Sequence, residues 1–482
     1  MKLLKILSKC KVLQIIGNEE IDIKTVCFDS RKVGKGALFV AFKGVTSDGH
    51  DFIRQAVEAG ATAIVCEKIP EEQLPATIIQ VDDSHLALSI IASNFYGNPS
   101  ESLKLIGITG TNGKTTTVTL LYRLFTELGY KCGLLSTIAN FVVDKQVGAT
   151  HTTPDPIEIN ELLSQMAECG CEFCFMEVSS HSLDQKRVAG LHFTGAIFSN
   201  ITHDHLDYHK TLEEYIRVKK SLFDNLPSTA FALVNIDDKN GMVMLQNTSA
   251  KKYTYSCHSP ANFNCRIIEK SMDGMLLNID NREVWTRFIG EHNAYNILAV
   301  YATAVILGAN KEEVLLKLSN MTSVAGRLEY LKGKNDITAV VDYAHTPDAL
   351  ENVLKTLRET ARGKKLTTVF GCGGNRDRSK RPEMAEIAAK YSDRIIVTSD
   401  NPRFEDPDEI IKEIKNGFNH NDLSKTIFIT DRKEAIRTAI ITALPGEVIL
   451  VAGKGHEDYQ DVKGEKHHFD DKEIIAETFN QL

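Results

Sequence analysis

The sequence predicts an α/β protein of three domains with mainly parallel sheets. The length of 482 residues suits two to four domains, because one domain commonly takes about 100–200 residues. Apolar residues make up 43% of the chain and charged residues 25%, which is ordinary for globular domains with buried cores. The expected strands and helices alternate along the chain, and this order favours parallel sheets that are covered by helices.

The first predicted domain is a small α/β unit over residues 1–103. Its strands are expected at 37–42, 62–66 and 77–81, and its helices at 51–59 and in the segment that ends at residue 96. The turn-forming segment Gly97-Asn98-Pro99-Ser100 follows and indicates a linker.

The second predicted domain covers residues 104–330 and carries a mainly parallel sheet. It opens with an apolar strand at 105–109, a glycine-rich loop and a helix at 115–128, an order that is typical of phosphate-binding loops. Further strands are expected at 172–176, 195–199 and 231–234, with helices at 212–223 and 294–307.

The third predicted domain, residues 331–482, is a Rossmann-like, doubly wound unit. Its strands are expected at 338–341, 366–370, 394–398, 426–429 and 448–451, and its helices at 347–358, 382–391, 407–418 and 432–444. Ligands of such sheets bind at the carboxyl ends of the strands. Polar motifs at those ends are therefore candidates for a binding site.

Charge and cysteine content restrict the classes of partner. The formal net charge of -8 argues against general nucleic-acid binding, which needs a basic surface. No apolar run approaches the roughly 20 residues that span a bilayer, and the start of the chain lacks a signal-peptide cleavage site. The ten cysteines are scattered, which is typical of reduced thiols. We expect a cytoplasmic monomer that binds small molecules and does not insert into a membrane.

The cysteines at 169, 171 and 174 form the closest thiol group. A zinc site would need a second ligand pair at suitable spacing, and the sequence provides none. We interpret these cysteines as small side chains at the start of a strand.

The glycine-rich loop is the clearest functional motif. It reads Gly110-Thr111-Asn112-Gly113-Lys114-Thr115-Thr116. Its glycines let backbone N–H groups surround phosphate oxygens, Lys114 can reach the outer phosphates, and the Thr115 hydroxyl can bind Mg²⁺. Ile108 stands where the usual pattern has its first glycine. The strand–loop–helix setting favours phosphate binding over a glycine-rich turn with a solvated lysine.

Acidic and imidazole side chains indicate a metal site. Glu177 ends an apolar strand, where a carboxylate is well placed to hold Mg²⁺. The segment 203–209 holds three histidines and two aspartates, a mixture that suits metal or phosphate binding, although a solvated polar loop has the same composition. By composition alone, Lys219 would be a surface lysine.

Together these segments resemble the Mur ligase family of peptidoglycan synthesis, in family order from about residue 28 to residue 457. The family motifs are Gly110–Thr116, Glu177–His181, Asp204–Asp207, Gly290 with His292, Asn293 and Asn296, Gly326–Glu329, and Asp342–His345. Motifs typical of the diaminopimelate-adding branch are Asp29–Arg31, Thr152–Pro154, Gln185–Arg187, Gly373–Asp377, Asp400–Arg403 and Gly453–Glu457.

The resemblance implies a role for each matched position. The uridine-linked precursor would contact Ser30, Val45, Thr46, Ser47, Thr152, Thr153, Ser179, Gln185 and Arg187. ATP would contact the loop 110–116 with Asn293, Asn296, Arg327 and Asp342. Mg²⁺ would be held by Thr115, Glu177, His205 and a carboxylated Lys219. Diaminopimelate would contact Arg376, Asp400, Asn401, Pro402, Arg403, Gly453 and Glu457.

The implied activity is an ATP-dependent ligation that adds meso-diaminopimelate to UDP-N-acetylmuramoyl-L-alanyl-D-glutamate, a step on which cell shape and cell division depend. A carboxylate is a poor electrophile, so ATP would convert it to an acyl phosphate, with Mg²⁺, Lys114 and the loop amides offsetting the charge. The amine of diaminopimelate would then displace phosphate, assisted by His345 or a nearby carboxylate. A carbamate on Lys219 would be an anion that Mg²⁺ stabilises.

Three alternatives to this activity remain: a lysine-adding relative of the ligase, folylpolyglutamate synthetase and a P-loop switch. Arg403 suits the distal carboxylate of diaminopimelate, and a lysine-adding relative should lack this arginine. Folylpolyglutamate synthetase should lack the first domain's Asp29–Arg31 segment. A P-loop switch should hydrolyse ATP without the precursor.

Overall fold

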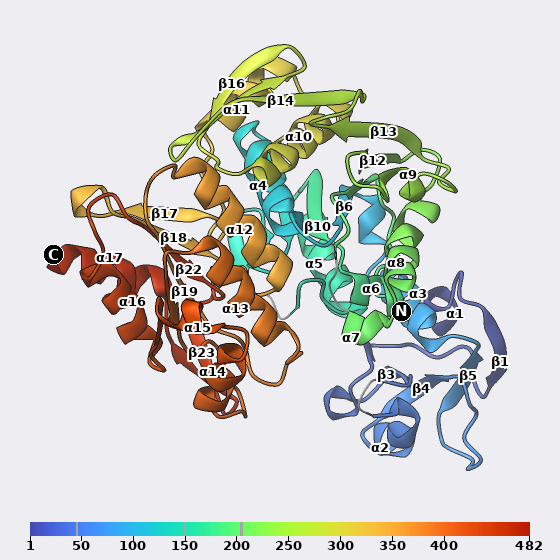
Figure 1. Ribbon diagram of the computed structural model, residues 1–482. Helices are drawn as coiled ribbons and strands as arrows, with labels where there is room; N and C mark the ends of the chain where they lie inside the picture. Colours follow the sequence, from blue (N-terminus) through green and yellow to red (C-terminus); the bar gives the residue numbers. More distant parts are fainter. Residues whose placement is uncertain (45–46, 149–150, 203–205) are drawn as a thin grey trace. The chain divides into compact units, whose positions relative to one another are not determined.

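The computed structural model describes residues 1–44, 47–148, 151–202 and 206–482. It confirms the predicted class, an α/β protein of three domains with parallel-rich sheets (Figure 1). The chain divides into two compact units, Met1–Gly110 with Thr117–Ser199 and Glu213–Thr254, and Thr111–Thr116 with Asn200–Leu212 and Tyr255–Leu482. The domain boundaries at residues 103 and 330 stay a prediction.

The N-terminal domain is a five-stranded sheet in the order β1-β5-β4-β3-β2. Strands β2 to β5 are parallel and β1 is antiparallel to β5. The strands are β1 Val12–Ile16, β2 Thr25–Cys27, β3 Ala37–Val40, β4 Ala61–Cys66 and β5 Thr77–Val81, and the α-helices are α1 Leu3–Ile6, α2 Ile53–Glu58 and α3 Ser84–Phe95. The three predicted strands are confirmed, although β3 ends two residues early, and β1 and β2 were not predicted because they are short and partly exposed.

The central sheet has eleven strands, of which eight run in the order β13-β12-β11-β6-β10-β7-β8-β9. Strands β12, β11, β6, β10 and β7 are parallel, and β6 and β10 are buried along almost their whole length, which explains their uninterrupted apolar runs. The strands are β6 Lys104–Thr109, β7 Cys132–Leu135, β8 Asn140–Val142, β9 Lys145–Val147, β10 Phe173–Glu177, β11 Gly195–Phe198, β12 Phe231–Asn235 and β13 Lys251–Ser256. The helices are α4 Lys114–Glu127, α5 Pro156–Glu168, α6 Ser180–Asp184, α7 Leu206–His209, α8 Leu212–Asp224 and α9 Gly241–Met244.

An antiparallel segment that the sequence did not predict follows β13. It consists of β14 Phe263–Ser271, β15 Gly274–Ile279 and β16 Arg282–Thr286. Helices α10 Glu291–Ile306 and α11 Lys311–Asn320 follow, and α10 confirms the helix predicted at 294–307. Only alternate positions of β14 are buried at its start. This leaves no apolar run of the kind that marked the buried parallel strands.

The C-terminal domain has the predicted doubly wound sheet, in the order β17-β18-β22-β19-β20-β21. All its strands are parallel except β17. The strands are β17 Glu329–Lys332, β18 Thr338–Asp342, β19 Leu366–Phe370, β20 Arg394–Val397, β21 Thr426–Phe428 and β22 Val448–Ala452, with the hairpin β23 Tyr459–Val462 and β24 Glu465–His468. The helices are α12 Pro347–Thr360, α13 Lys380–Tyr391, α14 Pro407–Lys415, α15 His420–Leu423, α16 Arg432–Ile441 and α17 Asp471–Gln481.

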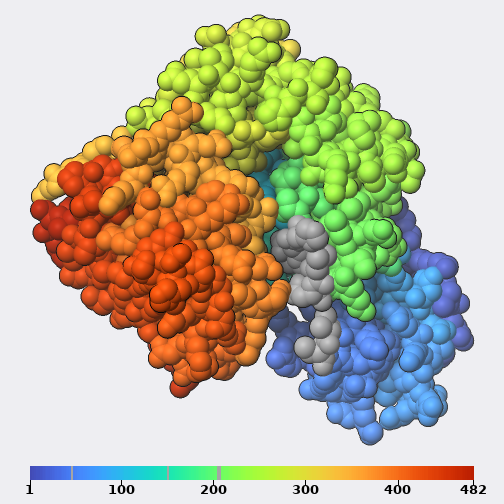
Figure 2. Space-filling model, viewed as in Figure 1, coloured from blue at the N-terminus to red at the C-terminus, as the bar shows by residue number. Residues whose placement is uncertain are grey.

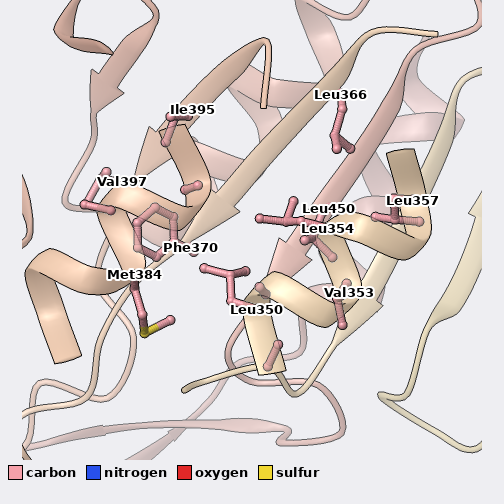
Figure 3. Packing of buried hydrophobic residues seen from close by; sticks show 14 of the residues in the cluster. Leu350, Val353, Leu354, Leu357, Leu366, Phe370, Met384, Ile395, Val397 and Leu450 are labelled. Atoms are coloured by element: carbon pink, nitrogen blue, oxygen red, sulfur yellow. The ribbon is translucent and has the colours of Figure 1, made fainter. Parts of the chain in front are cut away.

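Apolar side chains fill both faces of this sheet. Leu350 and Leu354 of α12 pack against Phe370 and Leu450 on one face (Figure 3), and α16 and α17 cover the other face. Figure 2 shows the side chains of the same domain, in orange to red, packed closely at the surface. Among the described residues, no helix is both long and apolar enough to cross a bilayer.

Candidate active site

The phosphate loop begins where β6 ends and leads directly into α4. Asn200 holds the loop: its carbonyl accepts the Thr111 N–H at 2.8 Å, and its Oδ1 accepts the Asn112 N–H at 3.0 Å. Lys114 Nζ donates to the Thr111 carbonyl at 2.7 Å, so its ammonium folds back over the loop. Ile108, at the position of the missing glycine, is buried inside β6, which makes this loop shorter than the usual pattern.

Asn296 and Arg327, two of the predicted ATP contacts, lie directly at this loop. Gly113 has a φ of 86°, and a Cβ there would lie 2.5 Å from Asn296 Oδ1, so only glycine lets Asn296 approach. Asn296 in turn donates to Asn293 Oδ1 at 3.0 Å. Arg327 Nη2 lies 3.4 Å from Thr115 Oγ1. The structure therefore groups Gly113, Thr115, Asn293, Asn296 and Arg327.

Asp342 ends β18 and is buried. Its oxygens accept the N–H groups of Leu328 and Ala344, both at 2.8 Å. Burial raises the pKa of the Asp342 carboxyl, whereas Arg327 and the two amides oppose this shift. Arg327 also stacks on the Tyr343 ring at 4.9 Å. Asp342 thus fixes the backbone that presents Arg327.

Glu177, one of the predicted metal ligands, lies at the carboxyl end of β10, which neighbours β6 in the sheet. Ile108 pairs with Glu177 across β6 and β10, so the fully buried Glu177 side chain starts beside the end of β6. Glu177 Oε1 accepts the Thr137 N–H at 2.8 Å. Lys219, 1% exposed, donates from Nζ to the Gly110 carbonyl at 2.9 Å. This lysine is therefore buried at the start of the phosphate loop, which corrects the surface reading that composition alone favours.

His205 lies outside the described residues. Within the described ranges, no three His, Cys, Asp or Glu side chains gather as a preformed metal site. The predicted ligands Glu177 and Thr115 each offer a side-chain oxygen, and oxygen ligands are those that Mg²⁺ prefers. All ten cysteines are free thiols, and their assignment as small side chains without zinc stays a prediction.

Five of the predicted precursor contacts form one hydrogen-bonded group. Arg187 donates to the Thr153 carbonyl at 2.8 Å and to Gln185 Oε1 at 2.6 Å. The Thr153 hydroxyl lies 2.8 Å from the Glu177 carbonyl and accepts the Ser179 N–H at 3.1 Å. Thr152 accepts from the Thr137 hydroxyl at 3.1 Å. Through Thr153, the group therefore bonds to the backbone of Glu177, a predicted metal ligand.

The remaining predicted precursor contacts lie in the N-terminal domain. The Ser30 hydroxyl bonds to Gln55 at 3.2 Å, and the Ser47 carbonyl accepts the Gly44 N–H at 2.9 Å. Val45 and Thr46 lie outside the described residues. The structure gives no contact that joins Ser30 to Ser47.

A compact charged cluster occupies the C-terminal domain after β20 and β22. Asn401 Nδ2 donates to Glu457 Oε2 at 2.8 Å, and its Oδ1 accepts from Lys454 Nζ at 3.0 Å. A Cβ on Gly453 would lie 2.5 Å from Asp400 Oδ2, so this glycine is what lets the carboxylate approach. Lys454 is fully buried. The cluster thus holds two carboxyl side chains, Asp400 and Glu457, beside one buried lysine.

Arg403 lies on the same turn, after Pro402. Its Nη1 donates to the Gly374 carbonyl at 2.8 Å, and its Nε lies 3.9 Å from Asp461 Oδ2. Burial raises the pKa of the Glu457 carboxyl and Asp400 adds to this rise, whereas Lys454 opposes it. Arg376 is exposed on the neighbouring loop. His345 is also exposed, with Nδ1 2.8 Å from the Tyr343 carbonyl, and its role as a base stays a prediction.

Several residues of these clusters were not predicted. Thr137 follows β7, a strand that the sequence analysis missed, so its strand-end position gave no signal. Asp348 accepts from Asn112 Nδ2 and from the Thr202 hydroxyl, both at 3.0 Å, but an acidic residue in the first turn of a helix is explained by the helix dipole alone. Lys454 stands inside a recognised motif, yet its burial is visible only in the fold.

His456 provides a test of the burial around this cluster. Burial lowers the pKa of its imidazole to about 4, and Arg327 and Lys472 add to the effect. The imidazole of the unfolded chain takes up its proton near pH 6.5, whereas the folded chain keeps it neutral down to about pH 4. The contribution of neutral His456 to the free energy of unfolding is therefore complete above pH 6.5 and is lost as the pH falls toward 4. Between pH 7 and pH 4, the free energy of unfolding of His456→Asn should therefore fall by up to about 3 kcal/mol less than that of the wild type.

Thermal unfolding followed at several pH values between 7 and 4 measures the effect. The exposed His467→Asn variant is the control and should keep the wild-type dependence on pH. An unchanged slope in His456→Asn would contradict the prediction.

The fold and these clusters define a P-loop protein that carries a separate charged site on a doubly wound domain. Three family profiles match the chain: the Mur ligase family, catalytic domain, over residues 22–96, the Mur ligase middle domain over 108–304, and the Mur ligase, glutamate ligase domain over 326–455. The chain belongs to the Mur ligase family, as the sequence resemblance predicted.

Its relatives share one name along the full length. A protein of Cytophaga hutchinsonii, named UDP-N-acetylmuramoyl-L-alanyl-D-glutamate--2,6-diaminopimelate ligase, is 55% identical over 484 residues and all of both chains is covered. A protein of the same name from Bacteroides thetaiotaomicron is 55% identical over 482 residues with the same full coverage. A solved structure with this name matches with a TM-score of 0.72 at 31% identity, and covers 100% of this chain and 99% of that chain.

Proposed function

We propose that this chain is an ATP-dependent ligase that joins meso-diaminopimelate to UDP-N-acetylmuramoyl-L-alanyl-D-glutamate in peptidoglycan precursor synthesis. The observation that carries the proposal is the cluster of Asp400, Asn401, Arg403 and Glu457. It belongs to a chain that is 55% identical, end to end, to relatives named for this reaction. The free thiols support a reducing compartment, and we place the reaction in the cytoplasm.

The phosphate loop would activate the acceptor carboxylate. In-line transfer of the γ-phosphoryl group of ATP to the D-glutamate side chain forms an acyl phosphate and ADP. Lys114 and the loop amides would stabilise the negative charge of the transferred group. The amine of diaminopimelate then attacks the acyl carbon, inorganic phosphate leaves, and the amine loses a proton.

Mg²⁺ fits the donors near the loop. Thr115, Glu177, a carboxylated Lys219 and His205 would hold it, and it would supply charge neutralisation to the triphosphate. The buried amine of Lys219, 2.9 Å from the Gly110 carbonyl, supports carboxylation because a carbamate would turn a buried cation into an oxygen ligand.

Amino-acid choice would depend on Arg403. Its guanidinium suits the distal carboxylate that lysine lacks, and the carboxyl groups of Asp400 and Glu457 suit an ammonium. The lysine-adding alternative offers no partner for this arginine. Folylpolyglutamate synthetase is disfavoured because the relatives named for diaminopimelate addition also match the first domain.

The decisive experiment measures phosphate release from ATP by the purified protein. Release should require both the UDP-linked muramoyl dipeptide and an amino acid, and diaminopimelate should support it far better than lysine. Equal use of lysine would refute the assigned specificity. Release without the precursor would favour a P-loop switch.

Carboxylation of Lys219 has its own test. Protein equilibrated with ¹³C-bicarbonate should show a carbamate ¹³C resonance that Lys219→Met abolishes, and this variant should lose at least about a hundredfold in turnover. Lys220→Met is the control, because Lys220 pairs with Asp224 at 2.5 Å and should keep the resonance and the activity. A resonance that survives in Lys219→Met would refute carboxylation at this position.

A further inference from the structure

A buried guanidinium contacts the turn and the loop that carry Arg403 and Arg376 in the C-terminal domain. Arg381 stands in the first turn of α13 and its side chain is 0% exposed. A buried charge of this kind is costly unless it is fully paired. The partners of Arg381 therefore indicate what this charge holds in place.

Arg381 connects three segments of the chain. Its Nη1 and Nη2 donate to the two oxygens of Glu405, each at 3.0 Å, in a bidentate pair. Nη1 also donates to Glu413 of α14 at 2.6 Å, and Nη2 to the Gly373 carbonyl at 3.3 Å. The guanidinium thus joins α14, the turn that carries Arg403 and the loop that carries Arg376.

The turn that carries Arg403 and the loop that carries Arg376 also bind each other directly. Glu405 accepts the Asn375 N–H, and Asn375 Oδ1 accepts the Phe404 N–H at 3.0 Å. Arg403 Nη1 reaches the Gly374 carbonyl at 2.8 Å. Glu405 therefore links Arg381 to Asn375 and, through it, to Phe404. These two residues stand next to Arg376 and Arg403, the two proposed arginine contacts.

The backbone of Arg403 needs such support. Its φ of 52° lies in the left-handed region, which a residue with a side chain keeps only where its surroundings hold it. The hairpin β23–β24 supplies part of that support, since Arg403 N–H donates to the Asp461 carbonyl at 3.0 Å. Glu405 and Arg381 hold the other side of the turn.

We propose that Arg381 is a positioning residue for amino-acid selection: through Glu405 it sets the direction of the Arg403 guanidinium, and so the preference for an amino acid with a distal carboxylate. This inference rests on the proposed function and deepens it. Arg381 does not touch the amino acid. Its loss would leave Arg403 present but poorly aimed.

The chain offers a matched control in Arg378. This arginine contacts the same two carboxylates, Glu405 at 3.0 Å and Glu413 at 3.2 Å, but its side chain is 64% exposed. Solvent weakens exposed pairs of this kind. Burial, and not the presence of an ion pair, therefore separates the two arginines.

Steady-state kinetics of Arg381→Gln, Arg381→Lys and Arg378→Gln test the proposal. Arg381→Gln should raise KM for diaminopimelate about a hundredfold, the loss expected from a small misplacement of a binding group, with KM for ATP within about twofold of wild type. The ratio of kcat/KM for diaminopimelate over lysine should fall in parallel. Arg381→Lys should lie between, because lysine keeps the charge without the bidentate geometry. Arg378→Gln should behave as wild type.

The outcomes separate this inference from the function beneath it. If the wild type uses diaminopimelate but Arg381→Gln keeps its KM and its preference over lysine, the positioning role is overturned. Equal rises in KM for all three substrates in both Arg381 variants would show a merely structural residue and would also overturn it. A wild type that does not use diaminopimelate would overturn the proposed function itself.

Discussion

Replacing Lys114 by methionine is expected to abolish ligation, with phosphate release falling by about a thousandfold or more. The ammonium of Lys114 folds back over the loop, 2.7 Å from the Thr111 carbonyl, where the outer phosphates of ATP would lie. The transferred phosphoryl group carries its negative charge into the transition state, so a positioned cation stabilises that state strongly. Methionine keeps the length of the side chain and removes only the charge. Phosphate release with all three substrates present measures the effect.

Lys104→Met is the matched control for this experiment. Lys104 begins β6, the strand that leads into the phosphate loop, is exposed, and lies over the Phe173 ring at 4.8 Å. Its loss should change turnover by less than about twofold, as for most exposed residues. If Lys114→Met kept more than a tenth of wild-type turnover, the loop would not be the site of phosphoryl transfer.

Replacing Arg403 by alanine should reduce kcat/KM for diaminopimelate by about a hundredfold or more. The guanidinium is three-quarters buried and hydrogen-bonded to the Gly374 carbonyl, so it is held ready for a carboxylate and loses little entropy on binding. Lysine has no distal carboxylate, so its weak use should change by less than about threefold. Competition between the two amino acids in one reaction mixture gives the preference directly.

Arg437→Ala serves as the control for this substitution. Arg437 belongs to α16 and pairs only loosely with Glu434, at 3.9 Å on the same helix. Its removal should leave both amino acids unaffected. An equal fall for diaminopimelate and lysine in Arg403→Ala would place the distal carboxylate elsewhere.

The sequence analysis located the parallel strands well because burial on both faces gives them continuous apolar runs. The strands at 105–109 and 366–370 were predicted within one residue of β6 and β19. The antiparallel segment β14–β16 was missed because buried residues alternate with exposed ones at the start of β14, so the segment lacks the continuous apolar run that marked the parallel strands. The hairpin β23–β24, which supports Arg403, is exposed or half-buried throughout and left no apolar signal at all.

The candidate site shows the same division between residues that the sequence indicates and residues whose burial only the fold reveals. Lys114, Glu177 and Arg403 were predicted as site residues because each belongs to a motif in which neighbouring residues restrict the chemistry. Arg381 and Lys454 were not singled out, although both are fully buried. A lone lysine or arginine is usually exposed, and nothing next to it in the sequence shows otherwise.

The order of apolar and turn-forming residues by itself determined the α/β class and the doubly wound third domain, and the motifs determined the family, because these features depend on residues close together in the chain. The tertiary structure alone decided which polar groups meet. Gly113 and Asn296 are 183 positions apart, and only folding brings the asparagine oxygen within 2.5 Å of the position where a Cβ would stand. Burial then turns Arg381 and Lys454 from ordinary cations into fixed parts of a site, since a charge without water must be paired.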